Sequence, residues 1–103
     1  MNFDQLSDFQ GFDWDQGNRD KNRVKHNVFD GECEEIFFNA PLIMIDDTRH
    51  SDEELRIAAF GITNAGRMLT VVFTMRQQLV RVISARDMNK KERRFVNDHE
   101  EDT

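Results

Sequence analysis

Basic side chains able to bind phosphate groups are concentrated in two parts of the chain. Residues 67–94 contain eight arginine and lysine residues, interrupted by only two acidic ones, and a smaller basic cluster spans residues 19–25. Clustered positive charge attracts phosphate-rich ligands, and the planar guanidinium group of arginine can hold two phosphate oxygens at once. The pattern therefore favours a phosphate-rich partner. The alternative is a solvated surface whose charges are balanced by acidic residues elsewhere.

Two histidines lie where they could move protons. Imidazole gains and loses a proton near neutral pH, so His26 and His50 are candidates for acid or base roles. Lys25 and His26 fall near the end of an expected helix, where the helix dipole favours positive charge, so capping of that helix end is the alternative interpretation. The third histidine, His99, lies in an acidic C-terminal segment and is expected to be solvated.

Metal binding and thiol chemistry are both disfavoured. Asp46 and Asp47 end a short apolar run, and adjacent carboxylates at the end of a strand point to opposite faces, which disfavours chelation of one ion. The only cysteine, Cys33, excludes an internal disulfide. It lies on the apolar side of an expected helix, where a buried, inert thiol is more common than a nucleophile. We therefore expect no metal and no other cofactor.

Length and charge indicate one small domain with acidic ends. The chain has 103 residues and a net charge of −6, yet residues 18–97 hold 14 basic and 12 acidic residues. No apolar run is long enough to span a membrane and no secretory signal is visible, so we expect a cytoplasmic protein. We expect a flexible acidic leader over residues 1–11. The acidic tail over residues 98–103 is expected to be solubilising, or alternatively to cover the basic surface as a phosphate mimic.

The spacing of apolar residues predicts the elements that position these side chains. Helices are expected over residues 18–26 and 29–40, and a capping-box spacing of Asn89 and Glu92 predicts a last helix over residues 90–99. Alternation with period two predicts strands over residues 42–45, 56–62, 68–75 and 79–85. The order indicates an α+β domain with two N-terminal helices, an antiparallel sheet of about four strands and a C-terminal helix.

The strand over residues 68–75 has two chemically distinct faces. Its odd-numbered residues, from Leu69 to Met75, are all apolar and should face the core, whereas the even-numbered ones are mixed and could line a working surface. If Gln77 and Gln78 form a two-residue hairpin loop, Thr74 lies opposite Arg81 and Arg76 shares their face.

The arginines in and around this hairpin lead to a hypothesis about phosphate binding. Arg67, Arg76 and Arg81 are expected to form a phosphate cradle, while Arg86 has the opposite parity and needs a bulge to join them. The alternative is that Arg81 pairs with a carboxylate on the sheet.

Several blocks of the sequence resemble the BrnT toxin family, in family order and with family spacing from about Phe12 to Phe95. The blocks are Phe12–Asp15; Asn18, Asn22, Lys25, His26 and Val28; Asp46–His50; Glu54 and Arg56; Gly66–Arg67; Val71–Thr74; Arg81–Arg86; and Glu92–Arg94. No single block is specific, but their combination in this order is.

The resemblance implies a RelE-like α+β fold over residues 12–97 and the activity of a ribonuclease toxin from a type II toxin–antitoxin pair. Family members cleave RNA without a metal, and a BrnA antitoxin with a ribbon-helix-helix DNA-binding part neutralises them. We therefore expect an RNA substrate, inhibition of translation and growth, and a BrnA-like partner in a hetero-tetramer that contacts DNA only through the antitoxin.

Metal-free RNA cleavage by the ribose 2′-hydroxyl needs a base, cations near the phosphoryl oxygens and an acid for the leaving oxygen. Residues from the matching blocks and from the basic strands are candidates for these roles. The catalytic candidates are Lys25, His26, His50, Arg67 and Arg81. The RNA-binding candidates are Arg49, Thr74, Arg76, Arg86 and Arg94.

The chain departs from the family at two aromatic positions and in its overall charge. The family usually has tyrosine at the position of Phe73 and often near that of Phe95, and its members are typically basic. If those tyrosines serve catalysis, a non-catalytic relative that only binds an antitoxin is the alternative. A general nucleic-acid-binding module is less favoured, because no strand rich in stacking aromatic residues accompanies the basic ones.

Overall fold

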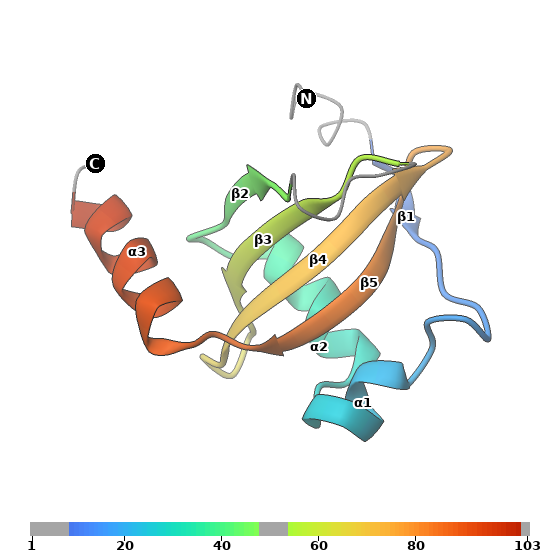
Figure 1. Cartoon of the computed structure of the whole chain (residues 1–103), viewed down its shortest axis with the longest axis horizontal. Coiled ribbons are helices and arrows are strands. Elements are labelled where there is room, and N and C mark those ends of the chain that lie inside the picture. Colours follow the sequence, from blue (N-terminus) through green and yellow to red (C-terminus); the bar gives the residue numbers. More distant parts are fainter. Residues whose placement is uncertain (1–8, 48–53, 102–103) are drawn as a thin grey trace.

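A computed structural model describes residues 9–47 and 54–101 of the chain. The described residues form a five-stranded mixed sheet, in the order β1-β5-β4-β3-β2, and three α-helices (Figure 1). The strands are β1 (Gly11–Phe12), β2 (Ile43–Asp46), β3 (Ile57–Ile62), β4 (Met68–Arg76) and β5 (Leu79–Asp87). The helices are α1 (Lys21–His26), α2 (Asp30–Glu35), which continues into the 3-10 turn η2 (Ile36–Phe38), and α3 (Lys90–Glu101).

The α+β class, the two N-terminal helices and the C-terminal helix are confirmed, but the sheet is larger than expected. β1 adds a fifth strand, parallel to β5, with Gly11 paired to Leu79. A strand of two residues is too short to leave a periodic signal in the sequence, so it was missed. It also places Gly11 in the sheet rather than in a flexible leader. The likeness to the RelE fold stays a prediction.

The hairpin between β4 and β5 has the expected two-residue loop. Gln77 and Gln78 have φ angles of 52° and 67°, as both central residues of a type I′ turn require. Thr74 lies opposite Arg81 and Arg76 opposite Leu79, which confirms the predicted register.

A β-bulge in β5 changes which side chains share a face. Val72 pairs with Ser84, but the next residue, Phe73, pairs with Val82, so Ile83 is an extra residue in β5. Beyond the bulge the parity of β5 is reversed, and Arg86 pairs with Thr70. Because directly paired residues project from the same face, Arg86 and Arg81 lie on one side of the sheet.

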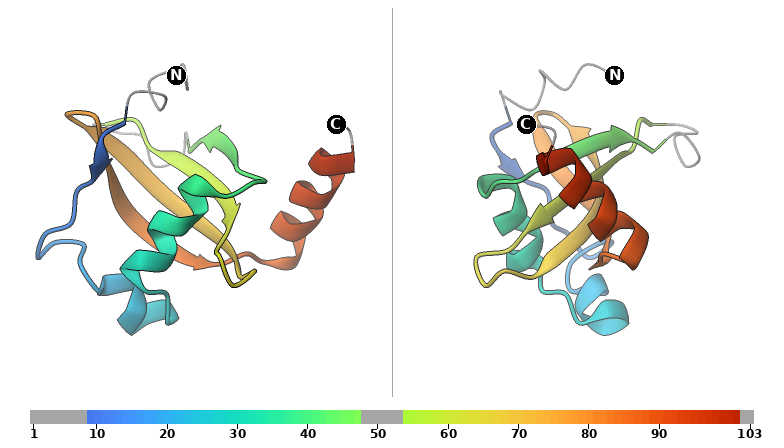
Figure 2. Two further views of the ribbon diagram at one scale, coloured as in Figure 1. Left: turned by 180° about the vertical axis from the view of Figure 1, so that it is seen from behind. Right: turned by 90° about the vertical axis from the view of Figure 1, so that its left-hand side faces the viewer.

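One face of the sheet packs against α2 and η2. Leu69, Val71 and Phe73 of β4 are fully buried there with Cys33 and Ile36 of the helical segment. Figure 2 shows α2 lying across this face. The apolar parity of β4 therefore faces the core, as predicted.

On the other face, α3 packs at one end. Met88 and Val96 form a second apolar cluster with Ala58 and Phe60 of β3. The helix begins with the predicted capping box: the Asn89 amide donates to Glu92 Oε1 at 2.9 Å, and the Glu92 amide donates to Asn89 Oδ1 at 2.8 Å. None of the helices in the described part of the chain has the length and apolar content that a bilayer crossing requires. Within the described residues, a large groove lies on the rest of this face, which we call the open face.

Candidate functional site

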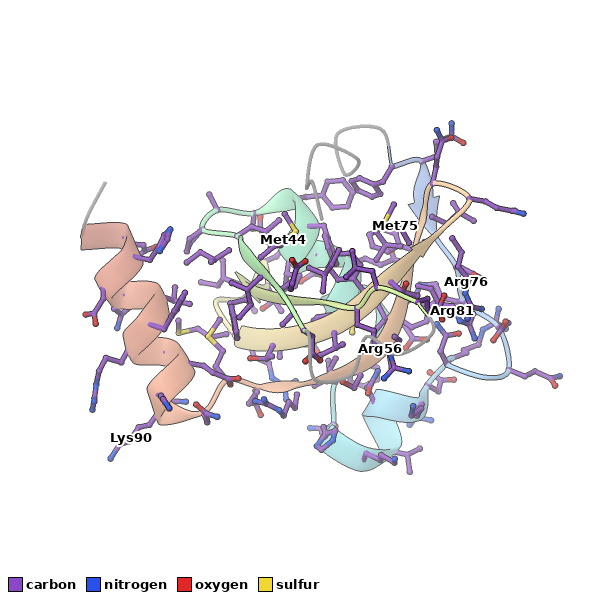
Figure 3. All side chains as sticks on the ribbon, turned by 45° about the horizontal axis from the view of Figure 1, so that its top comes forward. Met44, Arg56, Met75, Arg76, Arg81 and Lys90 are labelled. Carbon is purple, nitrogen blue, oxygen red and sulfur yellow. The ribbon has the colours of Figure 1, made fainter. Side chains whose placement is uncertain are left out.

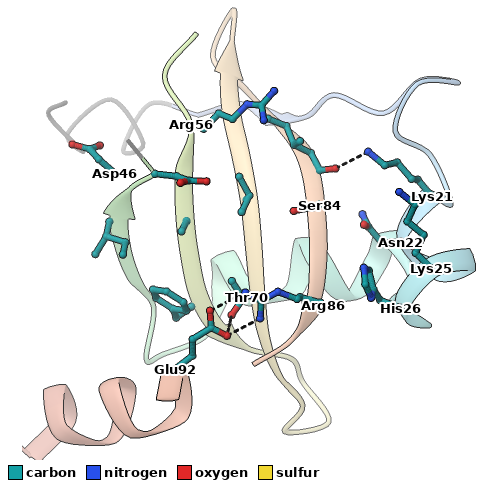
Figure 4. A pocket seen from close by; sticks show the side chains of 16 residues that line it. Lys21, Asn22, Lys25, His26, Asp46, Arg56, Thr70, Ser84, Arg86 and Glu92 are labelled. Atoms are coloured by element: carbon teal, nitrogen blue, oxygen red, sulfur yellow. Dashed lines mark hydrogen bonds and ion pairs between the residues drawn. The ribbon is translucent and has the colours of Figure 1, made fainter. Parts of the chain in front are cut away.

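A groove of about 700 Å³ lies on the open face between α1 and β2 (Figure 4). Its floor comes from the central strands, one wall from α1, and one end from the start of α3. The polar residues that line it are Lys21, Asn22, Lys25, His26, Asp46, Asp47, Arg56, Thr70, Ser84, Arg86 and Glu92. The groove thus combines four cationic side chains and an imidazole with three carboxyl groups.

Buried polar contacts hold α1 against β5. The Ala85 amide donates to Asn22 Oδ1 at 3.0 Å, and one turn earlier Asn18 Nδ2 donates to the Val82 carbonyl oxygen at 3.0 Å. Lys21 Nζ donates to the Ile83 carbonyl oxygen at 3.1 Å, at the bulge. These contacts present the remaining polar face of α1 to the groove.

Lys25 and His26 are exposed at the end of α1, near the helix end where they were expected, and they line the groove. The helix ends at Asn27, whose φ of 55° places it in the left-handed region. The two basic residues therefore lie both at a helix end and at the wall of the groove. The capping and chemical interpretations are compatible.

Arg86 crosses the end of the groove and is held by Glu92. Its Nη1 donates to Glu92 Oε1 at 2.7 Å and its Nη2 to Oε2 at 2.9 Å, while Thr70 Oγ1 donates to Oε1 at 3.0 Å. Burial opposes ionisation of Glu92, but the hydrogen bonds from Arg86, the Asn89 amide and Thr70 outweigh it and hold its pKa below the ordinary value. Glu92 therefore fixes a guanidinium group in the groove.

A smaller pocket of about 160 Å³ adjoins the groove and shares Lys21, Arg56 and Ile83 with it. Arg76 and Arg81 line this pocket, and Figure 3 shows both near Arg56 at one end of the sheet. The structure thus brings together two of the three predicted cradle arginines.

Both of these arginines are held by carboxylates. Arg81 donates to the two carboxylate oxygens of Asp15 at 3.0 and 2.9 Å, and Arg76 Nη2 donates to Glu54 at 2.8 Å. The hydrogen bonds from Arg81 and from the Gly17 amide lower the pKa of Asp15. A phosphate group must displace these carboxylates to reach the guanidinium groups fully. The predicted alternative, a carboxylate partner for Arg81, is present, but the partner precedes α1 and is not on the sheet.

Arg67 lies apart from the other two arginines. Its Nε donates to Asp87 at 2.7 Å, and its Nη1 donates to Glu32 at 3.2 Å and to the Asn27 carbonyl oxygen at 2.8 Å. Arg67 and Arg76 flank the two ends of β4, roughly 30 Å apart at the rise of an extended strand. The structure therefore does not assemble the three-arginine cradle.

The remaining predicted site residues are scattered. Thr74 lines the smaller pocket with Arg76 and Arg81, but it is 2% exposed, and its hydroxyl donates to the Leu55 carbonyl oxygen at 2.8 Å. Arg94 is exposed on α3 and does not line the groove. Arg49 and His50 lie outside the described residues.

Eight polar residues of the groove were not predicted as site residues: Lys21, Asn22, Asp46, Asp47, Arg56, Thr70, Ser84 and Glu92. A signal for two of them was present in the sequence. Lys21 precedes Lys25 by four residues, so both lie on one helix face. Arg56 has the parity of Ala58, which pairs with Val72 on the open face. Ser84 reaches the groove because of the bulge, for which the sequence gives no clear sign.

The two aromatic positions that differ from the BrnT pattern lie away from the groove. Phe73 is fully buried on the core face, with its ring centroid 5.2 Å from that of Phe37. The Phe95 ring stacks on His99 and lies 5.7 Å from Phe60. Both rings serve packing here, so a missing hydroxyl at either position removes no group from the groove.

Comparison with known protein families agrees with this architecture. A family model described as "Ribonuclease toxin, BrnT, of type II toxin-antitoxin system" matches residues 14–92. This range includes every residue that lines the groove. No curated protein matches the chain. The match covers most of the chain and includes most of the blocks that resemble the family. The chain therefore belongs to the BrnT family of ribonuclease toxins of type II toxin–antitoxin systems.

Proposed function

We propose that this chain cleaves RNA in the groove of the open face without a metal ion, and that a BrnA-like antitoxin neutralises it. The observation that carries the proposal is the groove itself. Lys21, Lys25 and Arg86 line it together with the imidazole of His26, all within the segment that matches the toxin family. Cationic side chains along one groove are what binding of a nucleic-acid backbone requires.

The proposed reaction is an attack of the ribose 2′-oxygen on the adjacent phosphorus. The new O2′–P bond forms as the P–O5′ bond breaks, which leaves a 2′,3′-cyclic phosphate and a 5′-hydroxyl. His26 accepts the 2′-hydroxyl proton, and His50 is the candidate for protonating the leaving 5′-oxygen. Lys25 and Arg86 stabilise the charge that develops on the phosphoryl oxygens.

The adjoining pocket extends the proposed RNA site. Arg76 and Arg81 bind a neighbouring phosphate once RNA displaces Glu54 and Asp15 from them. Arg67 takes no part in this arrangement, because its hydrogen bonds tie the start of β4 to α2 and to the end of β5. Thr74 lines this pocket, but its hydroxyl donates to the Leu55 carbonyl oxygen, and Arg94 lines neither the groove nor this pocket. Arg49 lies outside the described residues.

The proposed partner is a ribbon-helix-helix antitoxin that forms a hetero-tetramer with this chain. In that assembly the antitoxin alone contacts DNA, and growth inhibition follows when the antitoxin is lost. Membership of a type II toxin family supports the existence of a protein antitoxin.

One observation favours a second candidate function. Arg76, Arg81 and Arg86 each have a carboxylate partner within the chain, and such pairs leave less positive potential for RNA. A non-catalytic relative that only binds its antitoxin is consistent with this pattern.

Incubation of the purified chain with a defined RNA in EDTA distinguishes the two functions. We expect cleavage with 5′-hydroxyl and 2′,3′-cyclic phosphate ends, and none in a matched RNA whose 2′-oxygens are methylated. Intact RNA under all conditions contradicts the proposed enzyme and supports the non-catalytic alternative. Cleavage that EDTA abolishes contradicts metal independence.

A further inference from the structure

Two buried asparagines join the segment around α1 to β5, and they differ in how their donors are used. Asn18 is 3% exposed and Asn22 is 1% exposed. The Asn18 amide is fully occupied: its Oδ1 accepts from the Asp15 amide at 2.8 Å, and its Nδ2 donates to the carbonyl oxygens of Asp13 and Val82 at 2.9 and 3.0 Å. Asn18 therefore has a complete structural role.

Asn22 has an occupied acceptor and an unoccupied donor. The Ala85 amide donates to its Oδ1 at 3.0 Å, which fixes the orientation of the side-chain amide, since exchanging Oδ1 and Nδ2 places two donors against each other. Among the described residues, no acceptor forms a hydrogen bond with the buried Nδ2. A buried donor without a partner is destabilising, so its presence calls for an explanation.

The position of Asn22 supplies that explanation. It lines the groove between Lys21 and His26, beside Ser84 (Figure 4). The surrounding positive charge of Lys21, Lys25 and Arg86 selects for an anionic acceptor over a neutral one. Glu92 is not that acceptor: it makes no hydrogen bond with Nδ2 and is instead held by Arg86, Thr70 and the Asn89 amide.

We propose that Asn22 Nδ2 donates a hydrogen bond to a non-bridging phosphate oxygen of bound RNA. This inference rests on the proposed function, in which the groove holds the RNA backbone. Asn22 and His26 are four residues apart on α1, so their Cβ atoms are about 5–6 Å apart. The phosphate that Asn22 holds is therefore the one beside the proposed base, and Asn22 positions the reacting group.

Side-chain NMR of the wild-type chain tests the contact directly. The probe is a short RNA in which methyl groups on the 2′-oxygens prevent cleavage, and the observed signals are the side-chain NH2 resonances of Asn22 and Asn18. We expect the Asn22 resonances to shift on titration and those of Asn18 to stay within the change seen for residues remote from the groove. Unshifted Asn22 resonances when RNA is bound overturn the inference.

A second probe separates phosphate from base recognition. An abasic oligonucleotide keeps the phosphodiester backbone but lacks all nucleobases. We expect it to shift the Asn22 resonances in the same direction as the methylated RNA. A shift that requires the bases means that Asn22 reads a base, and it overturns the assignment to phosphate.

Substitution gives the energetic test. Asn22→Asp keeps an oxygen for the Ala85 amide but replaces the donor with an acceptor, so we expect binding of the methylated RNA to weaken about 10- to 100-fold. Asn39→Asp makes the same chemical change outside the groove, where Asn39 Nδ2 donates to Ile62 and Asn64, and serves as the control. Equal affinities of folded Asn22→Asp and Asn39→Asp overturn the inference. If Asn22→Asp does not fold, the NMR titration of the wild-type chain decides.

Failure of this inference is distinguishable from failure of the proposed function. Cleavage by the wild-type chain with unshifted Asn22 resonances rejects the Asn22 contact alone. Shifted Asn22 resonances without any cleavage support the contact and reject the enzyme. If neither cleavage nor RNA-dependent shifts are observed, both the contact and the proposed enzyme are rejected.

Discussion

Replacing Glu92 by glutamine isolates the charge that holds Arg86 in the groove. The glutamine keeps one oxygen for the Asn89 amide and for Thr70, so the capping box survives. It loses the second oxygen and the negative charge, and with them the two-point contact to Arg86. Replacement by alanine removes the capping contact as well.

The expected loss of stability follows from the exposure of the pair. The side chain of Glu92 is 17% exposed and that of Arg86 is 43% exposed, so solvent screens part of the interaction. We expect Glu92→Gln to lower the free energy of unfolding by about 1 kcal/mol. Glu92→Ala should cost about 1 kcal/mol more, because the helix cap is also lost. For a domain of this size, 1 kcal/mol corresponds to a Tm shift of about 4–8 °C.

The effect should depend on pH in a direction that the pKa of Glu92 sets. Because the folded state lowers this pKa, ionised Glu92 contributes stability above the ordinary carboxyl pKa of about 4.3. That contribution disappears as the pH falls through the lowered folded value. The difference in stability between wild type and Glu92→Gln should therefore be largest at neutral pH and should shrink toward zero at strongly acidic pH.

Thermal unfolding of both proteins at pH 7 and at pH 3 measures this difference. Asp98→Asn removes an exposed charge from the same helix and is the control, for which we expect a change within about 0.5 kcal/mol. The reasoning is refuted if Glu92→Gln behaves like the control at pH 7, or if its deficit is as large at pH 3 as at pH 7.

Three further predictions concern the core and the start of β4. Burial, with the nearby acidic side chains, raises the pKa of the Cys33 thiol to about 12, so mass spectrometry should find no alkylation by iodoacetamide at pH 8 unless denaturant is present. A Cβ at Gly61 would lie 2.7 Å from Ile36 Cβ, so Gly61→Ala should lower the free energy of unfolding by about 1–3 kcal/mol in denaturant titrations, whereas Gly31→Ala, with no atom within 4 Å, should not lower it. Arg67→Ala should destabilise the fold by about 1–3 kcal/mol in the same titrations, because Arg67 is a structural clamp; unchanged stability with lost RNA cleavage contradicts this role.

The features that could be predicted from the sequence are those set by local geometry. The apolar parity of β4 placed Phe73 in the core, and the loop of Gln77 and Gln78 fixed the register that sets Arg81 opposite Thr74. The capping box at Asn89 depends only on a three-residue spacing. Each of these features follows from residues that are neighbours in the chain.

The features that were missed depend on contacts between distant segments. The bulge at Ile83 reverses the parity of β5 and brings Arg86 to the open face, and parity alone could state only that a bulge was needed. Arg67 was grouped with Arg76 by residue type, although the length of β4 separates them. The sequence does not show that Asn22 Oδ1 accepts a hydrogen bond from β5 while its Nδ2 has no partner among the described residues; only the structure does.

The two faces of the sheet have different roles in this small domain. Burial of the apolar parity against α2 supplies stability, which leaves the polar parity available for charge. The bulge and the asparagine contacts then set α1 beside that surface. The proposed function depends on the packing of α1 against β5, because the proposed RNA site lies between this helix and the strands.

The most direct test of the account is the rate of RNA cleavage by His26→Ala compared with His99→Ala. His26 lies in the groove, whereas His99 is exposed on α3, where it stacks on Phe95. Loss of a general acid or base typically slows a reaction by about 10²- to 10⁴-fold. We expect that loss for His26→Ala in EDTA and a wild-type rate for His99→Ala. A folded His26→Ala protein that cleaves RNA at the wild-type rate contradicts the central claim that the groove is the catalytic site.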